Sequence, residues 1–306
     1  MNQTVEFNKS ENERAVKLYR RMARLVFLTI NILLVTAVFT LAQSNLDDLK
    51  FKISNGSTEE KRNALFAIRS VHNAEASTIA IPALTDADPL VRATAASSVV
   101  FLPKDEAAKI LIPMLADKVD FVRMETAVAL GKTASTTATQ PLLDLLKREK
   151  NAEVRNAVVS SLGHIGDTAA IETLTAILKK NPSEDTELLR RSAARSIGQI
   201  AQMLLTGTTK VDTPFNFLPE KYKQPGTPDA AEKIGQFPAF KTAIVTLTKV
   251  LLSNKEADDT RRETAFALGS IGDPASAAPL RSNLNSPDNY LAEICKEALL
   301  KIEQPK

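Results

Sequence analysis

The sequence is poor in the residues that most often carry chemistry. It contains one cysteine, two histidines and no tryptophan among 306 residues. A single cysteine, Cys295, excludes an intrachain disulfide, and so few His and Cys residues leave little material for a transition-metal site. Neither a phosphate-binding G-x-x-x-x-G-K-[ST] loop nor a G-x-S-x-G nucleophile elbow occurs. We therefore expect a protein that is not an enzyme, with no catalytic residues, no metal and no cofactor.

An excess of charge of one sign is also missing from most of the chain. Lys and Arg total 39 and Asp and Glu total 36. Residues 1–42 hold six of the basic and three of the acidic residues, which leaves 33 of each over residues 43–306. A body without net positive charge lacks the electrostatic footprint of a nucleic-acid-binding protein. We expect protein partners and no nucleic acid.

One long hydrophobic run lies near the N-terminus. Residues 25–42 contain no charge, and a helix of this length spans about 27 Å, close to the thickness of a bilayer core. The preceding residues 1–24 are polar and basic, and the run ends in the small-residue sequence Thr40-Leu41-Ala42. Two interpretations stay open: a cleaved signal peptide, favoured if Met22 is the true start, or an uncleaved transmembrane anchor. Both place residues 43–306 outside the cytoplasm, either anchored or released after Ala42.

A helical pattern recurs along the rest of the chain. A central residue, usually Arg, is followed by small or apolar residues at +3, +4 and +7, and often by Gly at +8, which describes one stripe of an α-helix. We expect partner helices over 104–116, 139–148, 169–180, 240–252 and 275–284. The pattern predicts an all-α solenoid of about seven stacked helical hairpins over residues 45–303. Its central residues are Lys61, Arg92, Arg123, Arg155, Arg190, Arg261 and Cys295.

An acidic residue lies six positions before the central Arg in four of these repeats. With this pattern the chain resembles the HEAT-repeat family, in particular the short bacterial repeats similar to those of phycobilin lyases. The resemblance implies that the acidic residue and the Arg form a ladder that joins successive repeats. The ladder residues would be Asp86, Arg92, Asp117, Arg123, Glu149, Arg155, Glu184 and Arg190.

One insertion interrupts the array at residues 206–238, between the fifth and sixth repeats. It is rich in proline, it could hold one short helix after Thr227-Pro228, and it contains the aromatic residues Phe215, Phe217 and Tyr222. Long irregular loops in compact domains are commonly functional. Two roles stay open for these aromatics: packing back onto the solenoid, or contact with a partner.

The positions +1, +2, +5 and +6 are expected to point away from the buried stripe of each repeat helix. Next to the insertion these positions include Arg191, Arg195, Arg262 and Phe266. Arg and aromatic side chains are favoured at binding hot spots. We predict that these four residues and the aromatics of the insertion form a partner-binding surface, with a merely solvated face as the alternative.

The sequence thus favours a non-enzymatic protein-interaction scaffold, exported or membrane-tethered, that binds its partner on the concave surface of the solenoid. One alternative is a lyase-like or chaperone-like factor for a cofactor-bearing protein, by analogy with the phycobilin lyases. Another is a structural component of an envelope complex.

Overall fold

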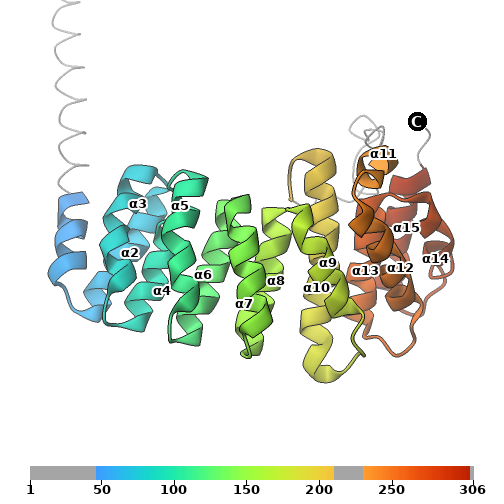
Figure 1. The fold of residues 1–306 in the computed structure, drawn as a ribbon, viewed down its shortest axis with the longest axis horizontal. Coiled ribbons are helices and arrows are strands. Elements are labelled where there is room, and N and C mark those ends of the chain that lie inside the picture. Colours follow the sequence, from blue (N-terminus) through green and yellow to red (C-terminus); the bar gives the residue numbers. More distant parts are fainter. Residues whose placement is uncertain (1–45, 210–229, 304–306) are drawn as a thin grey trace, which may run out of the picture.

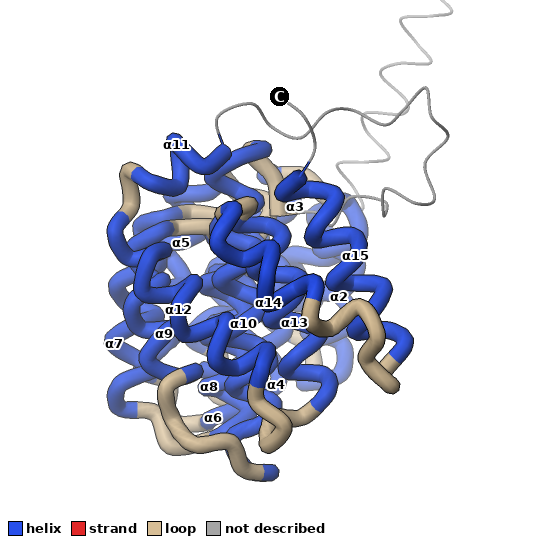
Figure 2. Tube along the Cα trace, turned by 90° about the vertical axis from the view of Figure 1, so that its right-hand side faces the viewer, coloured by secondary structure: helices blue, strands red, loops and turns tan. Residues whose placement is uncertain are grey.

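The protein forms a two-layered row of helical hairpins (Figure 1). The structure, a computed structural model, describes residues 46–209 and 230–303. Within these ranges helices are joined by short loops and no strand occurs (Figure 2). Across the same ranges the chain makes seven hairpins, which confirms the all-α solenoid predicted from the repeats.

The second helices of the hairpins form one layer, called here layer B. They begin at the acidic or small polar turn before each repeat and carry the central residue near their first turn. Asp88 shows the local cause: its carboxylate accepts hydrogen bonds from the backbone of Leu90 and Val91, and Pro89 opens the helix. Layer B consists of α2 (Thr58–Val71), α4 (Pro89–Ser98), α6 (Asp120–Thr133), α8 (Ala152–Ile165), α10 (Glu184–Thr206), α13 (Asp258–Ile271) and α15 (Asn289–Glu303).

The first helices form layer A, and several of them contain a 3₁₀ turn. Layer A consists of a helix over residues 46–55, α3 (Ala74–Ala80) with η1 (Ile81–Thr85), α5 (Lys104–Leu111) with η2 (Ile112–Ala116), η3 (Thr136–Ala138) with α7 (Thr139–Arg148), η4 (Thr168–Ala170) with α9 (Ile171–Leu178), α12 (Pro238–Leu252), and η7 (Pro274–Ser276) with α14 (Ala277–Arg281). The helices of layer B lie closer to one another than those of layer A. The array therefore curves toward layer B, which is its concave side.

Close approach within layer B depends on small residues. The glycines at +8 of four repeats lie directly against the next helix: a Cβ on Gly131 would lie 2.9 Å from the Cβ of Ser161, and one on Gly163 would lie 2.7 Å from that of Ser196. The Ser196 hydroxyl donates to the carbonyl of Val159 on the preceding helix, at 2.9 Å. The core between the layers is built mainly from Ala, Leu, Ile and Val.

The expectation that position +6 faces solvent is wrong. Ser98, Ser161 and Ser196 all occupy this position and all are buried. They lie between neighbouring helices of layer B, where the Ser98 hydroxyl donates to the carbonyl of Leu65 at 3.0 Å. The repeat pattern shows only the apolar stripe of each helix. In the stack each helix is buried between two neighbours of its layer, and the buried surface is wider than that stripe.

The insertion does not interrupt the stacking of layer B. Gly207, with a φ of 74° that favours glycine, caps the C-terminal end of α10. Helix α10 packs against α13 although the two helices are far apart in the sequence. A short helix, α11 (Ala230–Gly235), follows Thr227-Pro228 as predicted, with Ile234 buried and Phe237 packed against the core. Phe215, Phe217 and Tyr222 lie outside the described residues.

The predicted tail over 1–24 and the hydrophobic run over 25–42 also lie outside the part of the chain that the structure describes. Among the residues that it does describe, no helix combines the length and the apolar character needed to cross a bilayer.

We predict that Gly269→Ala destabilises the fold by about 1–3 kcal/mol, because the new Cβ would lie 2.6 Å from the Cβ of Ala298 on α15. Gly235→Ala is the matched control, since no atom lies within 4 Å of its added Cβ. It should be neutral or stabilising by up to about 1 kcal/mol through helix propensity. Urea unfolding of both variants measures the difference, and equal stabilities would contradict the close-approach argument.

Candidate functional site

A ladder of ion pairs runs along the loops that connect the two layers. Lys61 Nζ lies 2.6 Å from Asp86, Arg92 Nε lies 2.7 Å from Asp117, and Arg123 Nε lies 2.7 Å from Glu149. Each pair joins the helix of one hairpin to the loop of the next. The predicted ladder residues Asp86, Arg92, Asp117, Arg123 and Glu149 therefore come together, with Lys61 in the first rung.

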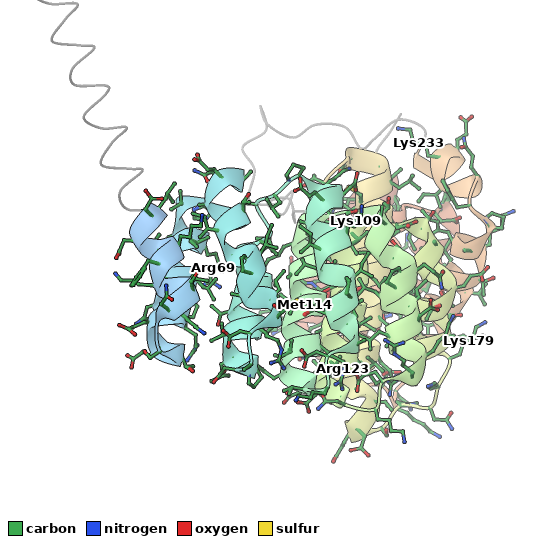
Figure 3. The ribbon with its side chains drawn as sticks, turned by 60° about the vertical axis from the view of Figure 1, so that its left-hand side comes forward. Arg69, Lys109, Met114, Arg123, Lys179 and Lys233 are labelled. Atoms are coloured by element: carbon green, nitrogen blue, oxygen red, sulfur yellow. The ribbon has the colours of Figure 1, made fainter. Side chains whose placement is uncertain are left out.

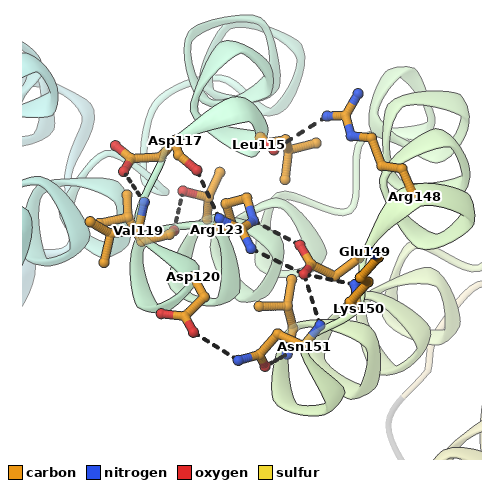
Figure 4. A network of polar contacts seen from close by, with 12 residues as sticks. Leu115, Asp117, Val119, Asp120, Arg123, Arg148, Glu149, Lys150 and Asn151 are labelled. Carbon is orange, nitrogen blue, oxygen red and sulfur yellow. Dashed lines mark hydrogen bonds and ion pairs between the residues drawn. The ribbon is translucent and has the colours of Figure 1, made fainter.

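The Arg123–Glu149 rung also orders the loops on either side of it (Figure 4). Arg123 Nη1 donates to the backbone carbonyl of Asp117 at 2.9 Å, so one guanidinium holds both its own loop and the following one. Glu149 accepts two further hydrogen bonds from the backbone of Lys150 and Asn151, at 3.0 and 2.9 Å. These hydrogen bonds orient the Glu149 carboxylate toward the Arg123 guanidinium.

The rungs shift the pKa values of their carboxyl groups. The hydrogen bond from Arg92 lowers the pKa of Asp117, and the hydrogen bond from Arg123 lowers the pKa of Glu149. In both cases the stabilised form is the carboxylate. The ladder therefore stabilises the fold where these carboxyl groups are ionised.

The ladder is broken between the fourth and fifth hairpins. The Arg155 side chain has no hydrogen-bond or ion-pair partner among the residues that the structure places, and its Nε is buried. Glu184 is exposed in the first turn of α10, where Ser183 and Thr186 form a capping box. The prediction that Glu184 and Arg155 take part in the ladder is wrong, because the longer connection before α10 carries the acid away from the loop.

Arg190 forms an ion pair with Glu256, which lies on the other side of the insertion in the sequence. Its guanidinium donates to both carboxylate oxygens of Glu256, Nε at 3.0 Å, and both side chains are only 2% exposed. Sequence reasoning missed Glu256, because it lies five rather than six residues before the central Arg261. The shared order of an acid shortly before each central residue was the signal that could have found it.

A second line of ion pairs crosses the concave face near the C-terminus. Arg191 binds Asp259 at 2.7 Å, Asp259 also binds Arg262 at 2.7 Å, and Arg262 binds Asp288 through Nε and Nη2, both at 2.8 Å. Arg195 binds Glu263 at 2.7 Å. The three predicted arginines thus have intramolecular partners, and their positive charge is balanced by three carboxylates that the sequence reasoning did not select.

Two aromatic residues complete this region. Phe266 is half-buried because its ring lies over Gly198, whose added Cβ would be 2.7 Å from the ring. Tyr290 is 73% exposed, and the Arg262 guanidinium lies 5.1 Å from its ring centroid. We call the residues Arg191, Arg195, Arg262, Phe266 and Tyr290 the C-terminal patch. Of the predicted set, Arg191, Arg195, Arg262 and Phe266 come together here.

Other features offer little chemistry. A cavity of about 320 Å³ lies between α9 and α12, lined by Glu172, Thr175, Lys179, Pro238, Ala239 and Thr242. Burial raises the pKa of the Cys295 thiol to about 12, so it is not a nucleophile at neutral pH. No group of His, Cys, Asp and Glu residues within 46–209 and 230–303 could hold a metal ion.

Two protein-family models match this chain, and both describe helical repeats. The model for HEAT repeats matches residues 47–131 and 121–198, and the model for the PBS lyase HEAT-like repeat matches residues 260–286. No curated protein sequence matches this chain.

Several solved structures are similar to this chain at low identity. Human deoxyhypusine hydroxylase is 18% identical, with a TM-score of 0.38, over 86% of this chain and 98% of that one. The complex of CpcE and CpcF of phycocyanin lyase from Nostoc sp. PCC7120 is 21% identical, with a TM-score of 0.45, over 85% and 88%. An engineered protein is 19% identical, with a TM-score of 0.48, over 85% and 69%.

We predict that Arg123→Ala costs about 2–4 kcal/mol of stability, because it leaves the Glu149 carboxylate, with a side chain only 6% exposed, without its cation. Lys147→Ala is the matched control: it removes a cation of the exposed Asp144–Lys147 pair and should cost less than about 1 kcal/mol. Urea unfolding at neutral pH measures both.

The same variant should respond to pH in a defined direction. Glu149 has a lowered pKa in the folded state, so the stability it contributes is present above its unfolded pKa of about 4.3 and is lost as the pH falls through the folded value. The difference in free energy of unfolding between wild type and Arg123→Ala should therefore shrink below about pH 4. A constant difference down to pH 2 would show that lost packing, not the ion pair, causes the effect.

Proposed function

Because the chain belongs to the HEAT-repeat proteins, we propose that it is a non-enzymatic scaffold that binds a protein partner on the concave face formed by layer B. The observation that carries this proposal is the C-terminal patch. There Tyr290 is 73% exposed and its ring is supported by the Arg262 guanidinium. Exposed aromatic rings fixed beside arginines are typical of residues that dominate binding energy.

The ion pairs of the patch support this role. Arg191, Arg195 and Arg262 are each held by a carboxylate of the next helix, so their side chains lose little conformational entropy when a partner binds. Their charges are nearly balanced within the patch. A partner would thus meet a preorganised surface of ring faces and guanidinium planes with little net charge.

We place this scaffold outside the cytoplasm, tethered or released. The proposal rests on the uncharged run over 25–42 and its basic flank. Intact-mass measurement of the purified protein decides between the two forms: a mature N-terminus at Gln43 would identify a cleaved signal peptide, and the full-length mass an anchor. A full-length mass in a soluble cytoplasmic fraction would contradict both.

The binding surface is tested with the double variant Tyr290→Ala and Arg195→Ala. We expect affinity for a partner, identified by crosslinking and affinity purification from the cell envelope, to fall at least tenfold, because the variant removes the exposed ring and one arginine of the C-terminal patch. The matched control is Val245→Ala with Leu252→Ala, two exposed apolar residues of α12 in layer A. The proposal fails if both variants bind equally, provided that both melt like wild type.

A further inference from the structure

A different cluster lies at the N-terminal end of the same concave layer. Arg62, Phe66 and Arg69 lie on α2 at spacings of four and three residues, and therefore on one stripe of the helix. The Cζ atoms of Arg62 and Arg69 lie 5.8 and 5.1 Å from the centroid of the Phe66 ring. The ring is 37% exposed. Figure 3 labels Arg69 in this blue part of the array, far from Lys233 near the other end.

Arg62 and Arg69 differ in their charge balance from most arginines of layer B, although Arg155 on α8 also lacks an ion-pair partner among the described residues. Arg92, Arg123, Arg190 and Arg262 each contact a carboxylate of a neighbouring hairpin. Within the part of the chain that the structure describes, no carboxylate lies at ion-pair distance from Arg62 or Arg69. The Arg62 Nε atom is buried without an acceptor, and Arg69 reaches only the Ser97 hydroxyl, at 3.4 Å.

Three of the acidic residues around this cluster have partners, while Glu59, three residues before Arg62 on α2, is exposed and forms no ion pair within the described residues. Glu60 accepts from the backbone and hydroxyl of Ser57 in the capping box of α2. Asp86 binds Lys61 in the first rung of the ladder, and Asp88 caps α4. The first hairpins thus present two guanidinium groups, with an aromatic ring between them, that form no ion pair with a described carboxylate.

The geometry points to an acidic segment of a protein partner: we propose that Arg62, Phe66 and Arg69 bind it, one carboxylate on each guanidinium and an apolar side chain over the ring. The inference rests on the proposed scaffold function. Two arginines seven residues apart on a helix are separated by about 10 Å. Two glutamates three positions apart span about 9 Å on one face of a peptide in the polyproline II conformation, which has three residues per turn. Guanidinium groups bind carboxylates in a bidentate manner.

A polyanion such as a nucleic acid or an anionic membrane fits this cluster less well. Residues 43–306 carry 33 basic and 33 acidic residues, so the body does not provide the run of cations that a regular array of phosphates requires. Two cations beside one apolar ring match a short segment that carries apolar side chains between two acidic ones.

The test measures binding of a labelled Glu-Leu-Leu-Glu peptide to the full-length chain by fluorescence anisotropy at low salt. We expect saturable binding that weakens at least fivefold for Arg62→Ala with Arg69→Ala and for the peptide with both glutamates replaced by glutamine. Arg62→Lys with Arg69→Lys keeps both charges and should bind with intermediate affinity, because it loses the bidentate contact. Phe66→Ala should weaken binding about threefold.

The control is Arg148→Ala with Arg281→Ala, which removes the same charge from layer A and should leave binding unchanged. Thermal melting of each variant separates lost binding from lost folding. Equal binding by the glutamine peptide, or by the Arg62→Ala and Arg69→Ala variant, would overturn the proposal. Binding to vesicles of anionic lipid that depends on the same two arginines, without peptide binding, would also overturn it. Because the C-terminal patch is unchanged in these variants, failure here leaves the proposed scaffold function standing.

Discussion

The close stacking of the layer B helices is the constraint on which the rest of this structure depends. Neighbouring helices approach so closely that a methyl group on Gly131, Gly163 or Gly269 would overlap the next helix. Such an approach buries small hydroxyls as well as methyl groups, and it lets a core form from aliphatic residues without tryptophan. It also curves the array and so creates the concave face on which we place the binding surfaces.

The ladder complements this stacking at the ends of the helices. Each rung joins a guanidinium or ammonium to the loop of the next hairpin, in sites that are largely removed from solvent. Its geometry depends on the length of the loop that carries the acid. Where the connection before α10 is longer, Arg155 loses its partner, and where the insertion separates two hairpins, Arg190 is still joined to Glu256. The register of the stack, rather than distance along the chain, decides which residues meet.

The charges on the concave face divide it into two regions of different character. Near the C-terminus three arginines are balanced by acids of adjacent hairpins, and one of them, Arg262, lies against the exposed ring of Tyr290. Near the N-terminus Arg62 and Arg69 flank Phe66 without a carboxylate from the described residues. The first region suits a partner surface with little net charge, and the second an acidic segment. A partner that contacts both would be oriented along the array.

The sequence by itself determined the helices, their pairing into seven hairpins and the place of the insertion, because these depend on periodic burial and local turn chemistry. The resemblance to HEAT repeats also implied the ladder, of which two predicted rungs, Arg92–Asp117 and Arg123–Glu149, form. The sequence could not show that position +6 is buried, that Glu184 turns away or that Glu256 meets Arg190. Likewise, only the tertiary structure showed that Arg191, Arg195 and Arg262 are paired internally while Arg62 and Arg69 are not. These contacts join residues of different hairpins, so they are decided by how the helices stack and not by any pattern within one helix.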